Sequence, residues 1–259
     1  MERDGYQLRY SSEHRESVYD RERREQKAQK ILAVLEDHFG AALRSQTVLD
    51  IGCSAGTISA LIGERVRRLT GVDIDEEAVQ YARAEHGAEG LRFEVGDAMA
   101  LSFGEASFDV VLCNHIYEHV PDARRLLAEI HRVLKPGGVC YFAAGNRLKW
   151  MEDHYRLPLL SVIPKPLAHL WLRCTGRAER YYEKHLTCWQ LRRLVEPFER
   201  IDYTRRIVEQ PERFRATEML RSGTLQQRLA LAVLRFAYWL APTYIWLLRK
   251  GRRISPQKG

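Results

Sequence analysis

The stretch VLDIGCSAG, residues 48–56, decides the fold. Its first half, VLDI, is a short apolar run of the kind that forms a buried strand. Its second half is a glycine-containing turn, and a helical pattern begins directly after it at Thr57. A strand that turns through glycine into a helix is the opening unit of a parallel α/β sheet, and the glycines let another group approach the backbone closely. The stretch therefore predicts both the sheet and a ligand site at its edge.

The same alternation of strand and helix continues along the chain. The expected strands are residues 47–53, 69–74, 91–97, 108–114, 138–145 and 200–208, and the expected helices are 57–67, 76–85, 123–134 and 187–195. This order predicts an α/β fold, a Rossmann-like, doubly wound and mostly parallel sheet with helices on both faces. The segment KPGG, residues 135–138, marks a change from helix to strand because Pro cannot continue a helix.

The alternation also sets the expected domain limits. Residues 1–40 are rich in charge and predict an N-terminal helical cap. Residues 41–208 form the main domain, in which residues 146–184, rich in aromatics and prolines, are expected as a lid insertion that also meets the substrate. Residues 209–259 are basic and apolar, and they predict a helical C-terminal extension.

The net charge of +7 is unevenly distributed. From residue 205 onward there are 12 Lys and Arg against three Glu, so residues 1–204 are slightly acidic overall. These residues show no interleaved basic and aromatic pattern, so nucleic acid is not an expected partner. The five cysteines contain no Cys-x-x-Cys pair, which argues against a disulfide framework and a zinc site. The first 16 residues contain no apolar run of signal-peptide length, so a cytoplasmic location is expected.

Two features of the first turn argue against a dinucleotide. Asp50 stands two residues before Gly52, where a carboxylate repels a pyrophosphate but accepts hydrogen bonds from an ammonium group or from turn amides. Ser54 stands where the middle glycine of Gly-x-Gly-x-x-Gly would be. A nicotinamide or flavin site is therefore the weaker interpretation.

Carboxylates also follow the next two strands. Asp73 ends the second strand, where an acidic side chain can accept both ribose hydroxyls of an adenosine. Asp97 ends the third strand, and with Ala98 it offers a carboxylate and a backbone amide to an adenine edge. Asp75 serves at least as well as Asp73 for capping the next helix. For Asp97 alone, a plain polar turn is an equally good explanation.

Taken in order, these segments resemble the class I methyltransferases that use S-adenosylmethionine, in particular the small-molecule group that includes quinone-biosynthesis enzymes. The segments that carry the resemblance are VLDIGCSAG, GVDIDEEAVQYAR, VGDAMAL, FDVVLCNHIYEHV and LLAEIHRVLKPGGVCYF. They cover roughly residues 30–145.

The resemblance implies S-adenosylmethionine as cofactor and gives each residue a place around it. The turn from Gly52 to Gly56 would meet the methionine part, and the side chains of the later strand ends would meet the ribose, the adenine and the reaction centre. The implied cofactor-binding residues are Asp50, Gly52, Ser54, Gly56, Asp73, Ile74, Asp97, Ala98 and Asn114. Ser54 departs from the commoner glycine, a change that should be tolerated if its φ is negative.

Methyl transfer needs an aligned nucleophile and, for a hydroxyl acceptor, a group that takes its proton. His115 and His119 are spaced i, i+4 with Glu118 beside them, so one helical turn would present all three on adjoining faces. Some members of the family have Glu-x-x-Glu-His here and bind a divalent ion, but this chain has His115 in place of the first Glu, so no metal is expected. A structural role is the alternative for His119. His154, in the insertion, is the first choice for a general base.

The C-terminal run LALAVLRFAYWLAPTYIWLL, residues 229–248, allows several interpretations. Arg235 and Pro242 argue against a membrane-spanning helix. A buried helical pair, packed on the sheet or on the second subunit of a homodimer, is the simplest alternative. An interfacial helix is another, with Trp239, Tyr244 and Trp246 at the depth of lipid headgroups.

A second apolar and basic segment, IPKPLAHLWLR, covers residues 163–173. With residues 225–253 it forms the expected peripheral contact with the inner face of the membrane. The expected function is methylation of an oxygen, less readily a carbon, of a small hydrophobic or lipid-linked acceptor. An RNA methyltransferase and a non-catalytic regulatory protein that binds S-adenosylmethionine are the alternatives.

Overall fold

The computed structural model describes residues 8, 10–13, 15–152 and 154–251. Its strands form one sheet in the order β3-β2-β1-β4-β5-β7-β6. They are β1 (Thr47–Ile51), β2 (Arg68–Asp73), β3 (Leu91–Val95), β4 (Phe108–Asn114), β5 (Leu134–Gly145), β6 (Glu199–Asp202) and β7 (Thr243–Arg249). Strands β1 to β5 pair in parallel, and β7 is antiparallel to β5 and to β6. The Rossmann-like sheet predicted from the sequence is confirmed.

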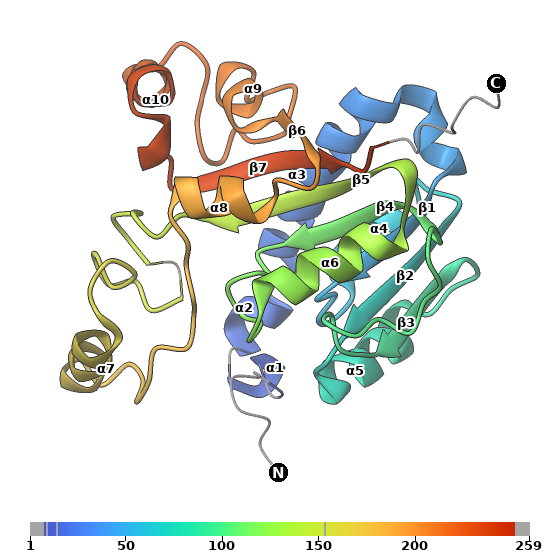
Figure 1. Cartoon of the computed structure of the whole chain (residues 1–259), viewed down its shortest axis with the longest axis horizontal. Coiled ribbons are helices and arrows are strands. Elements are labelled where there is room, and N and C mark those ends of the chain that lie inside the picture. The colour runs from blue at the N-terminus through green and yellow to red at the C-terminus, as the bar shows by residue number, and fades with distance from the viewer. Residues whose placement is uncertain (1–7, 9, 14, 153, 252–259) are drawn as a thin grey trace, which may run out of the picture.

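Helices cover both faces of this sheet (Figure 1). They are α1 (Tyr10–Glu13), α2 (Arg15–Tyr19), α3 (Arg21–Phe39), α4 (Thr57–Gly63), α5 (Glu76–His86), α6 (Ala123–Val133), α7 (Lys165–Cys174), α8 (Cys188–Leu194), α9 (Thr204–Glu209) and α10 (Leu225–Phe236). Two short 3-10 turns, η1 (Gly40–Ser45) and η2 (Tyr238–Leu240), complete the set. Apolar side chains of α3, α4, α5 and α9 form the core on one face, and those of α6 and α8 form the core on the other.

The C-terminal part of the chain differs from the structure expected from the sequence. Residues 243–249, expected to be helical within an extension that begins at residue 209, form strand β7 inside the sheet. The expected strand 200–208 is shorter, since β6 ends at Asp202 and α9 follows. The Asp202 side chain accepts a hydrogen bond of 2.9 Å from the backbone amide of Thr204, which turns the chain away from the sheet.

Strand β7 is apolar along most of its length because both of its faces are covered. Tyr244 and Trp246 are fully buried in the core beside α6 and α8, and Leu247 is buried in the opposite core. Pro242 directly precedes the strand and separates it from the helical part of the run. Tyr244 and Trp246 therefore do not lie at a lipid surface, and only Trp239 of the three expected aromatics is exposed. Within the described ranges, no helix is long and apolar enough to cross a bilayer.

The insertion after β5 forms a small lobe of its own, with α7 at its edge (Figure 1). It begins and ends at one place, where Asn146 pairs with Leu186 in an isolated parallel bridge. Its side chains make a third apolar cluster around Tyr155, Leu160 and Leu172. Helix α6 ends at Val133, just before KPGG as expected, but β5 begins at Leu134, so KPGG lies within the strand and does not precede it.

Candidate active site

The turn after β1 has two glycines with different structural tasks. Gly52 has φ of 73°, and a Cβ there would collide with the side chain of Ile116 from the loop after β4. Gly56 has φ of 81°, and a Cβ there would lie 2.8 Å from Cβ of Ala82 and 2.9 Å from the ring of Phe93. Gly52 thus lets the turn approach the loop after β4, while Gly56 packs α4 against α5 and β3.

Ser54, between these glycines, does not have the negative φ that was expected from the sequence. Its φ is 51°, in the left-handed region, and not negative. Its backbone amide donates a hydrogen bond of 2.7 Å to Oδ2 of Asp73, which holds the turn in this conformation. A side chain in the left-handed region costs roughly 1–2 kcal/mol, so the hydrogen bond keeps a strained turn in place.

A cavity of about 670 Å³ opens beside this turn at the carboxyl ends of the strands. The sequence-predicted residues that line it are Asp50, Gly52, Ser54, Asp73, Ile74, Asp97, Ala98, Asn114, His115, His119 and His154. Gly56 is not among the lining residues, because it faces α5 and β3 as described above. The structure therefore brings eleven of the twelve candidates together around one space.

The carboxylates of the second and third strand ends also shape their own loops. Asp73 accepts hydrogen bonds from the amides of Ser54 and, at 3.0 Å, Asp75, and burial raises its pKa. Asp75, not Asp73, caps α5 by accepting a hydrogen bond of 3.2 Å from the amide of Ala78. Asp97 accepts a hydrogen bond of 2.8 Å from the amide of Met99. Asp97 is thus both a turn residue and a cavity residue.

Asp50 lies deepest of the cavity carboxylates. Its side chain is 4% exposed, and its Oδ2 accepts a hydrogen bond of 2.6 Å from the hydroxyl of Ser59. Burial raises the pKa of Asp50 to about 7, against the effect of that hydrogen bond, and the charge of Asp73 acts in the same direction as burial. A carboxylate held this far from water is stabilised by any cation that enters the cavity.

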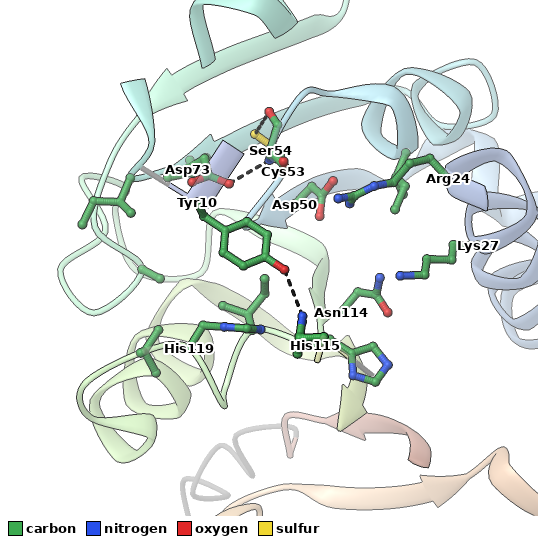
Figure 2. Close-up of a pocket in the computed structure, with 18 of the residues that line it drawn as sticks. Tyr10, Arg24, Lys27, Asp50, Cys53, Ser54, Asp73, Asn114, His115 and His119 are labelled. Atoms are coloured by element: carbon green, nitrogen blue, oxygen red, sulfur yellow. Dashed lines mark hydrogen bonds between the residues drawn. The ribbon is translucent and has the colours of Figure 1, made fainter. Parts of the chain in front are cut away.

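Basic residues of the N-terminal helices form a wall that the sequence analysis missed. Arg23, Arg24 and Lys27 of α3 line the cavity. Figure 2 shows Arg24 pointing toward Asp50 and Lys27 pointing toward Asn114. Burial lowers the pKa of Arg24. The only signal in the sequence is the cluster of basic residues in the first turns of a helix that becomes apolar later, and many solvated helices share it.

The same N-terminal region also contacts the insertion beside the cavity. Tyr10 of α1 lines the cavity, and its hydroxyl lies 3.2 Å from Nδ1 of His154 in the insertion. The ring of Tyr10 also meets the ring of His119 edge-on, with centroids 5.4 Å apart. Next to it, the amide of Ser11 donates a buried hydrogen bond of 2.8 Å to Asp75. The N-terminal cap and the insertion therefore meet over the cavity.

The three candidate histidines have different surroundings. His119 is packed against His154, with ring centroids 5.0 Å apart, and burial lowers its pKa to about 3. His115 is partly exposed to the cavity, and its Nδ1 lies 3.1 Å from Oε1 of Glu118. A neutral imidazole with so low a pKa is a weak base, so His119 is better suited to packing than to proton transfer.

A buried ion cluster fixes the insertion beside His154. Oε2 of Glu152 accepts hydrogen bonds of 2.8 Å from the amides of His154 and Tyr155. Its Oε1 lies 3.6 Å from Nζ of Lys149 and 3.6 Å from Nε2 of His185. Burial alone would raise the pKa of Glu152, but His185 and the nearby positive charges hold it at about 2. Glu152 is therefore ionised and shapes the backbone that carries His154.

Comparison with known proteins identifies the domain. Residues 49–142 match the family model described as a methyltransferase domain. The chain is 34% identical over 110 residues to the ubiquinone biosynthesis O-methyltransferase of Pseudomonas paraeruginosa, a match covering 41% of this chain and 47% of that protein. It is 34% identical over 119 residues to the protein of the same name from Idiomarina loihiensis, covering 45% and 49%. The chain contains a class I S-adenosylmethionine-dependent methyltransferase domain.

The chain spans about half the length of the curated relatives it matches. A solved structure of an S-adenosylmethionine-dependent methyltransferase from Methanosarcina mazei superposes with a TM-score of 0.51 at 21% identity. That superposition covers 81% of this chain and 94% of the other, and it shows a shared fold.

S-adenosylmethionine, the cofactor of this methyltransferase domain, fits the side chains of the cavity. A volume of about 670 Å³ lies in the range of sites for molecules of this size. The buried carboxylate of Asp50 suits an ammonium group, Arg24 suits a carboxylate, and Asp73 suits ribose hydroxyls. Among the residues that the structure describes, no three His, Cys, Asp or Glu side chains are arranged to hold a metal ion.

Proposed function

We propose that this chain transfers a methyl group from S-adenosylmethionine to an oxygen atom of a small hydrophobic or lipid-linked acceptor. The observation that carries the proposal is the cavity itself, which strand-end carboxylates and three histidines line together. Nitrogen bases beside a cofactor site are what removal of a hydroxyl proton requires. The names of the relatives, ubiquinone biosynthesis O-methyltransferases, favour a hydroquinone or a related phenol.

In this proposal each side of the cavity has its own task. Asp50, Asp73 and Asp97 hold the ammonium, ribose and adenine parts of the cofactor, and Arg24 binds its carboxylate. Bound S-adenosylmethionine supplies the electrophilic methyl group. Among the histidines at the end of β4 and in the insertion, one takes the proton of the acceptor hydroxyl. Tyr10 and the insertion exclude water from the reacting atoms, as a lid does.

A hydrophobic acceptor would also account for the apolar side chains that are exposed on α7 and α10. The apolar side chains most exposed on α7 and α10 are Leu167, Leu170, Leu225, Leu229 and Phe236. Trp189 and Trp239, both exposed, stack with centroids 5.8 Å apart beside α10. Exposed apolar and aromatic groups interspersed with arginines are typical of surfaces that rest on anionic lipid. We infer a peripheral contact at the inner face of the membrane, from which a cytoplasmic enzyme would take a lipid-linked acceptor.

The decisive experiment is turnover by the purified chain. S-adenosylmethionine is incubated with alkyl-substituted catechols and hydroquinones, and S-adenosylhomocysteine and the methyl ether are measured by mass spectrometry. Formation of both products in equal amounts supports the proposal. Tight cofactor binding without turnover of any hydroxyl acceptor would point instead to a regulatory protein. Salt-sensitive retention and methylation of RNA would point to an RNA methyltransferase.

A further inference from the structure

Glu118 is a buried carboxylate directly behind the cavity wall. Its Oε1 lies 3.1 Å from Nδ1 of His115, and the side chain of Glu118 is 1% exposed against 31% for His115. Its second oxygen, Oε2, is buried without a hydrogen-bond donor in the described part of the chain. A charged group in such a place is costly, and it calls for a functional explanation.

The charge state of this pair fixes the tautomer of the histidine. Burial alone would raise the pKa of Glu118, but the hydrogen bond from His115 brings it well below its usual range. An ionised carboxylate only accepts hydrogen bonds, so Nδ1 of neutral His115 carries the hydrogen. Nε2 is then the nitrogen that keeps its lone pair.

The backbone around the pair is built to hold this geometry. His115 has φ of 59°, in the left-handed region, while its amide continues the sheet with a hydrogen bond of 2.9 Å to the carbonyl of Ala143. Gly145, at the end of β5, leaves the room that the pair needs, because a Cβ there would lie 3.5 Å from Oε1 of Glu118 and 3.1 Å from His185. Strained conformations of this kind cluster at active sites, where the surrounding structure over-determines them.

We propose that His115 is the general base of the methyl transfer and that Glu118 is its positioning residue, an inference that rests on the proposed function. The acceptor oxygen forms its bond to the methyl carbon as the carbon–sulfur bond of the cofactor breaks. The proton of the acceptor hydroxyl moves to Nε2 of His115. Glu118 stabilises the resulting imidazolium, and the proton leaves to solvent through the cavity after the product has gone.

The other two histidines are less suited to this task. His119 is a weak base because of its burial, as described above. Nδ1 of His154 lies against the phenol of Tyr10, a neutral group that offsets an imidazolium charge less than a carboxylate does. His154 instead joins the insertion to the N-terminal cap. The histidines whose charges act on Glu118 are His115, His119 and His185, and His115 is the one that lies in hydrogen-bond contact with it.

The test uses two acceptors that differ in the acidity of the hydroxyl group, 4-methylcatechol and the more acidic 4-nitrocatechol. Glu118→Gln keeps the shape of the side chain, but its amide can donate to Nδ1 and favour the wrong tautomer of His115. We expect kcat to fall ~100-fold or more with 4-methylcatechol and ~10-fold or less with 4-nitrocatechol, because an acidic hydroxyl needs little help from a base. His115→Asn, which tolerates a positive φ, should show the same dependence on the acceptor.

Controls separate this inference from structural damage and from failure of the proposed function. Glu183→Gln removes another buried carboxylate and should change the two rates by equal factors. If Glu118→Gln also lowers both rates equally, or if His154→Ala alone shows the dependence on acidity, the assignment of His115 is overturned. Nitrogen-15 NMR of the histidine rings needs no turnover: a shift of His115 from the Nδ1–H to the Nε2–H tautomer in Glu118→Gln supports the pair, and an unchanged tautomer refutes it.

Discussion

The raised pKa of Asp50 makes cofactor binding dependent on pH. In the free protein, burial raises this pKa to about 7, so a large fraction of Asp50 is protonated at neutral pH. Because the pKa of Asp50 is higher in the folded protein than in the unfolded chain, its ionisation lowers the free energy of unfolding. This loss grows as the pH rises from about 4 to about 7. An ammonium group bound at Asp50 relieves this cost, because it favours the charged form of the carboxylate.

The size of the effect follows from the two pKa values. If the bound ammonium returns the pKa of Asp50 to its ordinary value near 4, the Kd rises as the pH falls below 7, by close to ~10-fold per unit. Between pH 7.5 and pH 5.5 we expect S-adenosylhomocysteine, which carries the same ammonium group, to bind ~20-fold more weakly. Binding at pH 5.5 should release about one proton per ligand.

Isothermal titration calorimetry in two buffers of different ionisation enthalpy measures both quantities. Asp50→Asn is the matched control, because the amide keeps the volume of the side chain and can still accept the hydrogen bond from Ser59. This variant should bind more weakly at pH 7.5 and lose most of the pH dependence. A wild-type Kd that does not change over this range, or an equal slope in Asp50→Asn, would refute the assignment of Asp50 to the ammonium group.

Three further predictions concern the turn after β1, the insertion after β5 and the exposed side chains of α10. Ser54→Gly should raise the free energy of unfolding by ~1 kcal/mol in urea denaturation, because glycine adopts φ of 51° without strain; a decrease would contradict this. Glu152→Gln should lower it by ~3 kcal/mol at pH 7 by removing the buried negative charge that lies 3.6 Å from Nζ of Lys149, and adding Lys149→Met should restore part of the loss. Paired Leu229→Ser and Phe236→Ser changes should reduce sedimentation with anionic vesicles ~10-fold without changing cofactor affinity; loss of a dimer instead would assign this surface to a second copy.

The first five strands and their helices could be predicted because local signals agree with the final structure. The run FDVVLCN matches β4 residue for residue, and Asp122, before the helix that follows, caps α6 through the amides of Arg124 and Arg125. Parallel strands buried on both faces are continuous apolar runs bounded by turns, and the helices between them carry one apolar face. For these elements, burial, turn chemistry and helix capping all favour the same structure.

The C-terminal strand could not be separated from a helix by the same signals. Residues 229–248 are apolar almost throughout, and only tertiary pairing decides where the helix ends and the strand begins. Strand β7 is completed by β5 on one side and β6 on the other, and these lie about 50 to 100 residues earlier in the chain. Its first residue follows Pro242, the one local signal that a helix does not continue.

In the candidate site, too, some features depend on nearby sequence and others on residues that are distant in the chain. The strand ends Asp50, Asp73 and Asp97 could be predicted, because the carboxyl ends of parallel strands meet at one edge wherever the sheet closes. The choice among the histidines could not, since a regular helical turn would place His115 and His119 in similar surroundings. His115 has a left-handed φ, and the two side chains have different neighbours. His115 contacts Glu118, whereas His119 contacts Tyr10 and His154. Tyr10 lies more than 100 residues before His119 in the chain, and His154 lies more than 30 residues after it. Chemical roles that depend on such neighbours emerge only from the fold, and the acidity of the acceptor is the measurement that separates them.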